Sequence, residues 1–408
     1  MKRILTFGLC LILVFCCGCA SILEGETLTV SPHAEERIGR SPEKAYVEVE
    51  DYEGLYGAVR DMVASHAEKG YIRASNYAGE LSKDVEEVCQ RVYYDDPLGA
   101  YALYYITGAT TRIVSYYEVE ITATYKRTLQ QINSIINASS LRYFESELLD
   151  RLTSYSDYFA FRVNLDSVTP ESITKYLTDS YYANPLKVVQ MPRVTANLFP
   201  DAGEERIAEV ECEYAYSARE LRNMTQSLQR AVVELSGRVE SELDHEILLE
   251  LCGMLSETAV FDMATANDGS FIQQDKAATA YGALVEHFAV GEGFAMAYKA
   301  LCDEFGIGCR VVIGRKNGVA HAWNIVRLDG EYFHVDVSSF DSDAPEESFL
   351  LGDGEMSDYW WDSLEAVPCD SERGFFDFFP PEEPVETPPE SEFPPEGEEP
   401  PPDEQSEF

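Results

Sequence analysis

An internal repeat constrains the fold of this chain more than any other feature. The run Tyr93-Tyr94-Asp95-Asp96-Pro97-Leu98 recurs as Tyr181-Tyr182-Ala183-Asn184-Pro185-Leu186, an offset of 88 residues. Glu118-Val119-Glu120 recurs as Glu209-Val210-Glu211, an offset of 91, and a longer hairpin loop around residues 201–203 explains the extra three. Repetition at this distance predicts two tandem copies of one small structural unit.

Each copy has the pattern of a small α+β module. The predicted order is a helix, a strand, a second helix that stops near the proline, and a two-stranded hairpin. These elements are expected at 54–69, 71–76, 81–93, 100–107 and 112–125, and again at 140–155, 158–164, 170–182, 187–198 and 205–217. The modules would span 48–130 and 138–220. Neither shows a nucleotide-binding glycine loop or a nucleophile triad, so packing, spacing or partner binding is their expected role.

The first 18 residues have the features of an export signal. Lys2 and Arg3 precede an apolar run at residues 4–15, which is too short to span a bilayer comfortably, and no later run of 18 apolar residues follows. The run ends in Cys16-Cys17-Gly18-Cys19, which resembles a bacterial lipoprotein signal, although Cys16 replaces the usual aliphatic residue. That resemblance implies a lipid on Cys19 and anchorage to the outer face of the cell membrane. An ordinary secretory signal is the alternative, and residues 19–47 would form a tether.

The charge of the chain excludes several partners. There are 31 basic and 73 acidic residues, a net charge of −42, so phosphate-rich nucleic acid would be repelled. Residues 380–408 contain ten Glu, one Asp, ten of the 19 prolines and no basic residue. A segment of this composition cannot bury a core. We therefore expect residues 376–408 to be a solvated, disordered tail.

The cysteines do not indicate a metal site. Four of the ten lie in the signal, and the others show no CxxC or Cys/His cluster, so no metal or cofactor is expected. Cys302 and Cys309 flank a turn at Gly306 and could form a disulfide, while buried free thiols are the simpler interpretation.

Residues 221–375 are expected to form a third domain, in which a connecting helix at 218–235 precedes helices packed on an antiparallel sheet. Its centre contains ordered motifs: Gly291-Glu292-Gly293-Phe294-Ala295, Cys309-Arg310-Val311-Val312-Ile313-Gly314, His321-Ala322-Trp323-Asn324 and Val335-Asp336-Val337-Ser338. Together they resemble the core of the transglutaminase-like superfamily, which is related to papain-like cysteine proteases. The resemblance covers about 60 residues and none of the two repeats.

The resemblance implies a catalytic set with one member missing. In that family a Cys begins the helix that matches 291–305, where the helix dipole lowers the thiol pKa. A His accepts its proton and an Asp orients the His. His321 and Asp336 match these two roles, but Gly291 stands at the position of the Cys. Trp323 and Glu292 are the expected binding residues.

The hairpin signal Asp329-Gly330 places the same two residues together independently of any family. A two-residue turn there pairs positions whose numbers sum to 659, so His321 lies diagonal to Asp336 on one face. Trp323 and His334 share that face. The opposite face is expected to be the core: Ala322, Val326, Leu328, Phe333, Val335 and Val337.

Three functions remain open at this point. The first is a catalytically silent surface protein that binds a peptide or a cell-wall component. The second is an enzyme of amide hydrolysis or acyl transfer that uses a non-standard nucleophile beside His321. The third is a purely structural lipoprotein. An open cleft at His321, Trp323 and Asp336 would favour the first two, and a filled cleft the third.

Overall fold

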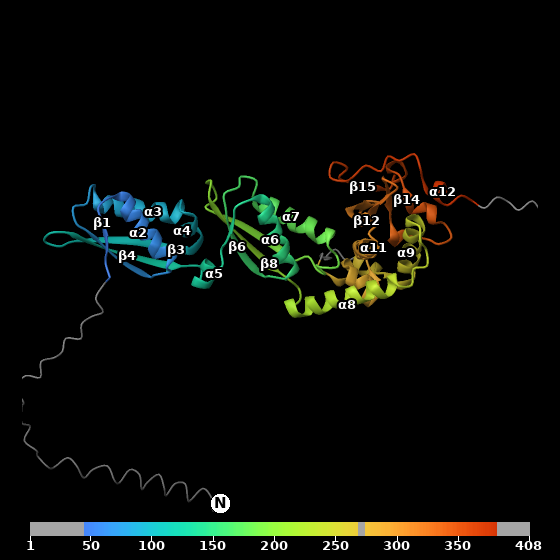
Figure 1. The fold of residues 1–408 in the computed structure, drawn as a ribbon, viewed down its shortest axis with the longest axis horizontal. Helices are drawn as coiled ribbons and strands as arrows, with labels where there is room; N and C mark the ends of the chain where they lie inside the picture. The colour runs from blue at the N-terminus through green and yellow to red at the C-terminus, as the bar shows by residue number, and fades with distance from the viewer. Residues whose placement is uncertain (1–44, 268–273, 382–408) are drawn as a thin grey trace, which may run out of the picture. The chain divides into compact units, whose positions relative to one another are not determined.

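The computed structural model describes residues 45–267 and 274–381 (Figure 1). The expected signal, nearly all of the tether and the acidic segment from residue 382 lie outside these ranges. The chain divides into a unit of residues 1–47 and a unit of residues 48–408. Among the described residues, no helix combines the length and the apolar character needed to cross a bilayer. The fold is of the mixed α+β class, as the sequence predicts.

The first repeat places helices on one four-stranded sheet. Its elements are β1 (Val47–Val49), α2 (Tyr52–Ala64), β2 (Lys69–Ala74), α3 (Leu81–Tyr94), α4 (Pro97–Ala102), β3 (Leu103–Arg112) and β4 (Tyr117–Tyr125). The strand order is β1-β2-β4-β3, and β4 runs antiparallel to both of its neighbours β2 and β3. In Figure 1, α2 and α3 lie along one side of this sheet.

The second repeat has the same plan. Its elements are α5 (Leu129–Asn133), β5 (Ile136–Ala138), α6 (Leu141–Thr153), β6 (Tyr158–Val163), α7 (Pro170–Ala183), β7 (Arg193–Phe199) and β8 (Arg206–Glu213). The strand order β5-β6-β8-β7 is that of the first sheet. The internal repeat of the sequence is therefore matched by a repeat of topology.

Local chemistry moves several element ends from their expected positions. The first helix of each repeat stops early, at Ala64 and Thr153, and a left-handed residue follows, His66 or Tyr155, each with φ 58°. The strand expected from residue 100 begins only at Leu103, because the Asp96 carboxylate accepts the N–H groups of Leu98 and Gly99 and starts α4.

The segment 187–192 is not the strand that alternation predicts. Val188 and Val189 are buried without a ladder, and Gln190 is also buried. The side chain of Gln190 bonds to the backbone at Gln274 and Ala215. The fully buried amide of Gln190 is therefore satisfied by these two backbone groups, which lie in distant parts of the chain.

A buried ion pair connects the two repeats. Arg127 donates through Nε and Nη2 to the two carboxylate oxygens of Glu209, at 2.7 and 2.6 Å. Glu209 is 1% exposed and also accepts the Tyr158 hydroxyl at 2.8 Å. A carboxylate so buried needs these donors, so removal of Arg127 would leave an uncompensated charge.

The third domain follows the long amphipathic helix α8 (Ala218–Ser236), which has the expected bounds within a residue. Its further helices are α9 (Asp244–Thr258), α10 (Met263–Asn267), α11 (Gly291–Glu304) and α12 (Phe375–Phe378), with short helical turns η1 (Lys276–Ala278), η2 (Gly282–Glu286), η3 (Val337–Ser339), η4 (Pro345–Glu347) and η5 (Asp353–Glu355). Its strands are β9 (Val260–Phe261), β10 (Phe288–Ala289), β11 (Cys309–Lys316), β12 (Val319–Leu328), β13 (Glu331–Val335), β14 (Phe349–Leu351) and β15 (Tyr359–Trp361). Five strands form an antiparallel sheet in the order β14-β13-β12-β11-β15.

Two tight turns set the register of this sheet. Asp329 and Gly330 both have positive φ, and β12 pairs with β13 from Leu328↔Glu331 to Asn324↔Val335, as the sum of 659 predicts. Asn317 and Gly318 have positive φ as well and join β11 to β12 in the same way. The expected core face is buried, and every member except Ala322 belongs to a core that also includes α11 and the second repeat.

The end of the described chain corrects the expected start of the tail. Residues from 376 were expected to be disordered, but Phe378 packs edge-on against Phe333, and Phe379 packs against Phe349 and His245. Aromatic side chains at these positions contact the core, so the third domain extends at least to residue 379.

Candidate functional site

His321 and Asp336 meet at the end of the β12–β13 hairpin. His321 lies on β12, and Asp336 directly follows the last residue of β13. The His321 Nε2 lies 2.9 Å from Asp336 Oδ2. The diagonal contact that the turn predicts is therefore present, and it uses the imidazole nitrogen farther from the backbone.

Asp336 is a buried carboxylate with many donors. Its side chain is 1% exposed, and it accepts Tyr359 at 2.7 Å and Lys316 at 3.2 Å as well as His321. Ser338 and Ser339 each add a hydroxyl at 2.7 Å. Burial alone would raise the pKa of Asp336, but the hydrogen bond and charge of His321, with Lys316 and Tyr359, hold it well below its usual range. Asp336 is therefore ionised and fixed.

The other nitrogen of His321 faces Gly291. A Cβ built on Gly291 would lie 2.6 Å from His321 Nδ1 and 2.7 Å from Cε1. A side chain at position 291 would therefore point at the nitrogen opposite the Asp336 contact. This is the arrangement that a nucleophile, a base and an orienting carboxylate require. The same distances show that the His321 ring occupies part of the space of the missing side chain.

The two glycines at the start of α11 have different reasons to be there. A Cβ on Gly293 would lie 2.2 Å from the Ala277 carbonyl oxygen and 2.9 Å from Ala289 Cβ, so close packing of backbone requires a glycine. At Gly291 the closest atoms belong to the His321 ring, and the residue is the first of a helix with ordinary backbone angles. Of the two, only Gly291 could accept a side chain, and this requires the His321 ring to move and the Ala322 carbonyl oxygen, 3.2 Å from the Cβ, to shift slightly.

No described side chain replaces the missing nucleophile. Ser338 Oγ lies 3.5 Å from His321 Nε2, but that is the nitrogen already bound to Asp336, and Oγ itself bonds to the carboxylate. A base accepts the proton of its nucleophile on the nitrogen opposite its orienting group. Ser338 is therefore in the wrong place.

The cysteines are equally unsuitable. All six within the described residues are buried free thiols, so the disulfide considered between Cys302 and Cys309 is not formed. Burial raises the pKa of Cys89 to about 11 and of Cys369 to about 12, and that of Cys302 well above its usual value. Cys89, Cys302 and Cys369 are therefore not thiolates at neutral pH.

The face that holds His321 is covered by a second, smaller core. Trp323 is 1% exposed and packs with Ile325, Leu351, Met356 and other residues of the segment 349–369. The sequence does not predict the strands of this segment, because β14 and β15 have three residues each and are too short to show alternation. Trp323 cannot contact a ligand unless this cover moves, so the cleft of the sequence prediction is filled at this point.

His334 joins the cover to the sheet. Its Nδ1 accepts the Trp323 Nε1–H at 2.9 Å, and its Nε2 lies 2.9 Å from Asp353 Oδ1. A neutral imidazole whose Nδ1 is an acceptor must have its proton on Nε2, so His334 donates to Asp353. Burial lowers the pKa of His334, which is consistent with the neutral form.

The same cluster has the composition of a metal site but not the chemistry. Donor atoms of His334, Asp353 and Cys369 lie within 4.8 Å of one another. Because the Trp323 N–H occupies Nδ1, metal binding through Nε2 would require an imidazole without any proton. Metal-bound histidines instead donate their second N–H to an acceptor. We therefore interpret the cluster as a hydrogen-bonded contact between β13 and the cover.

The Glu292 carboxylate is hydrogen-bonded to the second repeat. It lies in the first turn of α11, and its Oε1 accepts the hydroxyl of Tyr182 on α7 at 2.8 Å. Burial raises the pKa of Glu292 to about 7, and the Tyr182 hydrogen bond opposes this in part. The residue expected to bind a ligand instead joins the third domain to the second repeat.

The sequence predicted the pair His321–Asp336 but missed the other partners of Asp336. Ser338 and Ser339 are close in sequence, and hydroxyls that follow an Asp by two or three residues are a local signal. Lys316 and Tyr359 are 20 and 23 residues away on other strands. Nothing local points to either.

Comparison with known proteins gives distant similarities only. The chain matches no protein-family model and no curated protein. Among solved structures it is similar to a TGase, with 11% identity, a TM-score of 0.28, and coverage of 72% of this chain and 81% of that one. A candidate cysteine protease from Cytophaga hutchinsonii shows 13% identity and a TM-score of 0.23, with coverage of 36% and 62%. A candidate protease from Parabacteroides distasonis shows 7% identity and a TM-score of 0.22, with coverage of 66% and 43%.

Proposed function

We propose that this chain is an exported, lipid-anchored surface protein whose third domain is a transglutaminase-like domain without its nucleophile. In this proposal the domain performs no acyl transfer or amide hydrolysis and serves to bind a peptide or a cell-wall component. The lipid would be attached to Cys19, which lies outside the described residues.

One observation carries the proposal. A Cβ added to Gly291 would point at His321 Nδ1, while Asp336 is hydrogen-bonded to the opposite nitrogen, Nε2. A hairpin and a helix start arranged in this way are what a Cys–His–Asp set needs, and only the thiol is absent. The arrangement is unlike that of an unrelated buried histidine, for which position 291 would have no special relation to the ring.

A second candidate, a purely structural role, is favoured by the filled face. Trp323 and Asp336 are each 1% exposed, and His321 is also largely covered. The two candidates differ in whether the site geometry can still activate a nucleophile, and that difference can be measured.

The test is to restore the thiol with Gly291→Cys. An ordinary thiol with a pKa of about 8.5 is roughly 0.3% ionised at pH 6, whereas one lowered to about 6.5 is roughly a quarter ionised. The Gly291→Cys variant should therefore be alkylated by iodoacetamide at pH 6 many times faster than Ser115→Cys, a control thiol on an exposed turn. The double variant with His321→Ala should react slowly.

Two results would contradict the proposal, and they differ. If the wild-type protein hydrolyses or crosslinks amides, the proposal that the domain is catalytically inactive is wrong. If folded Gly291→Cys reacts no faster than Ser115→Cys, then the His321 ring does not yield its position and the structural role is the better account. Circular dichroism of each variant establishes that it is folded.

A further inference from the structure

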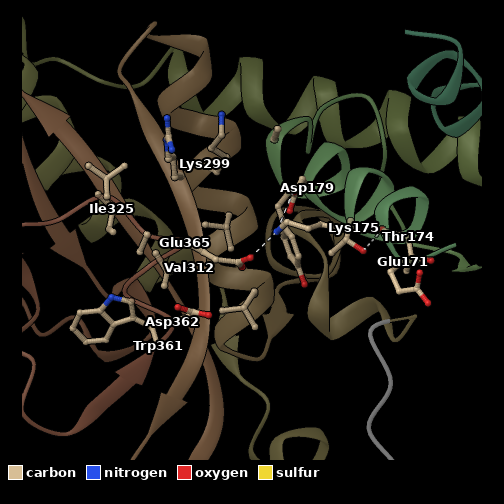
Figure 2. A pocket seen from close by; sticks show the side chains of 18 of the residues that line it. Glu171, Thr174, Lys175, Asp179, Lys299, Val312, Ile325, Trp361, Asp362 and Glu365 are labelled. Carbon is tan, nitrogen blue, oxygen red and sulfur yellow. Dashed lines mark hydrogen bonds and ion pairs between the residues drawn. The ribbon is translucent and has the colours of Figure 1, made fainter. Parts of the chain in front are cut away.

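A large cavity lies away from His321, where the second repeat meets the third domain. It has a volume of about 1310 Å³ and is lined on one side by α7 and β7 and on the other by β11 and residues 361–367. Figure 2 shows Lys175 and Asp179 on one wall and Val312, Ile325 and Trp361 on the other. Sites for small molecules usually enclose about 300 to 1000 Å³. This space suits a larger ligand.

The cavity runs along an open edge of β11. This strand has eight residues, but β15 pairs only with the last three, Gly314 to Lys316. The five before them, residues 309–313, all line the cavity. Successive side chains of a strand point to opposite faces, so five consecutive lining residues mean that the cavity follows the edge of the strand.

The edge of a second sheet borders the same space. β7 is the outermost strand of the sheet β5-β6-β8-β7, and three consecutive residues of it line the cavity, Val194, Thr195 and Ala196. Strand edges present rows of N–H and C=O groups that pair readily with an added strand. Two such edges on one cavity favour an extended chain over a compact ligand.

The volume agrees with this type of ligand. With the usual spacings of strands and sheets, one residue of a packed strand occupies roughly 160 Å³. The cavity of about 1310 Å³ therefore has room for roughly eight residues of strand. Five of them would extend along residues 309–313, in line with β15.

The charges of the lining favour a basic ligand. Of its three cations, Lys175 is paired with Asp179 and Glu365, Lys299 is paired with Asp303, and exposed Arg310 has no ion pair among the described residues. The lining includes four carboxylates, and within the described part of the chain no ion pair is recorded for two of them, Glu171 and Asp362. The net charge of the whole chain, −42, attracts cations from a distance.

The chain's own acidic segment is the wrong occupant on sequence grounds. Residues 382–408 are strongly acidic, and their many prolines lack the N–H that an added strand must donate. A separate partner with the opposite charge and few prolines fits better.

We propose that this cavity binds an extended peptide segment with basic side chains, which adds to the free edge of β11 as a strand that continues the line of β15. This inference rests on the proposed function in one respect only: it takes from it that the ligand is a peptide. It does not use Gly291 or His321, so the thiol experiment and the one below can fail separately.

The test uses a fluorescent probe peptide with alternating Lys and Val, and fluorescence anisotropy in buffer of physiological ionic strength. The full chain should bind this probe with a Kd below about 1 mM, and a Glu–Val probe at least about tenfold more weakly. A Lys–Val probe with N-methyl groups on alternate amides has the same charge but lacks the donors on one edge. It should bind at least about tenfold more weakly than the parent probe.

The internal repeat supplies a matched pair of variants. Thr195 on β7 pairs with Glu211, and Ala109 on β3 pairs with Glu120 at the equivalent place of the first repeat. Both residues are exposed on edge strands, but only Thr195 lines the cavity. Thr195→Trp should weaken probe binding at least about tenfold, and Ala109→Trp should leave it unchanged.

Three results would overturn the proposal. One is no binding of the Lys–Val probe up to about 1 mM. Another is equal binding of the N-methylated probe, which would mean that charge alone attracts it to the surface. The third is equal loss, or no loss, in the two tryptophan variants, which would place the probe elsewhere.

Discussion

The partly buried carboxyl of Glu292 makes the stability of this protein depend on pH near neutrality. Desolvation raises its pKa to about 7, and the hydrogen bond from the Tyr182 hydroxyl opposes this only in part. We expect Glu292→Gln to remove this dependence. The amide has nearly the same shape, can still accept the Tyr182 hydroxyl, and does not ionise.

The size of the effect follows from the shift. The ordinary pKa is 4.5 and the folded value about 7, a difference of about 2.5 units, and each unit corresponds to about 1.36 kcal/mol. Between these values the folded state binds more protons than the unfolded state, so the free energy of unfolding falls as the pH rises. Above pH 7 ionised Glu292 should cost the wild-type protein roughly 3 kcal/mol, and below pH 4.5 it should cost nothing.

Urea unfolding at a series of pH values between 4.5 and 8 measures this difference. Glu292→Gln should match the wild type at the acid end and be more stable by roughly 3 kcal/mol at pH 8. The control Glu304→Gln, exposed at the other end of α11, should follow the wild-type profile throughout. A difference between Glu292→Gln and wild type that does not change with pH would refute the reasoning, because it would mean that the group is ionised over the whole range.

Three more changes test other parts of the molecule. Asp336→Asn places an amide among donors that now bond to a carboxylate and should lower the free energy of unfolding by about 3 to 5 kcal/mol in urea titrations, whereas a loss below about 1 kcal/mol would mean that the donors have other partners. Cys19→Ser should give an uncleaved precursor or a processing intermediate by mass spectrometry, and an unchanged mass with full membrane retention would exclude lipid attachment there. Deletion of residues 380–408 should move the melting temperature in calorimetry by no more than about one degree, while a drop of several degrees would show that this segment packs on the domain.

Much of the local architecture follows from the sequence, because it depends on turns and short periods. The Asp329-Gly330 turn fixes the register of β12 and β13 from Leu328↔Glu331 to Asn324↔Val335, and the contact of His321 with Asp336 lies just beyond that ladder, where the register predicts it. Asn317-Gly318 is a two-residue turn signal of the same kind, and it predicts the β11–β12 hairpin. The repeated pattern likewise predicts the recurrence of one sheet order in two modules.

Errors arose where a local hydrogen bond competes with periodicity. Alternating apolar residues predict a strand from residue 100, but the Asp96 side chain caps a helical turn there. Buried Val188 and Val189 satisfy the same pattern without belonging to a ladder. In both places a side chain forms hydrogen bonds with backbone groups, which alternation of apolar residues does not reveal.

The tertiary structure alone decided what surrounds these elements. Tyr359 reaches Asp336 from 23 residues away, and Glu292 meets Tyr182 across 110 residues. The cover over Trp323 consists of short strands and loops without a period, and the cavity is lined by elements of two different modules, which include the edges of β7 and β11. The sequence by itself determined the hairpins, the repeats and the absence of a side chain at position 291, since each of these is set within a few residues of chain. The burial of Trp323, the pKa of Glu292 and the free edge of β11 depend on which distant parts of the chain come into contact. A local sequence pattern does not predict those contacts.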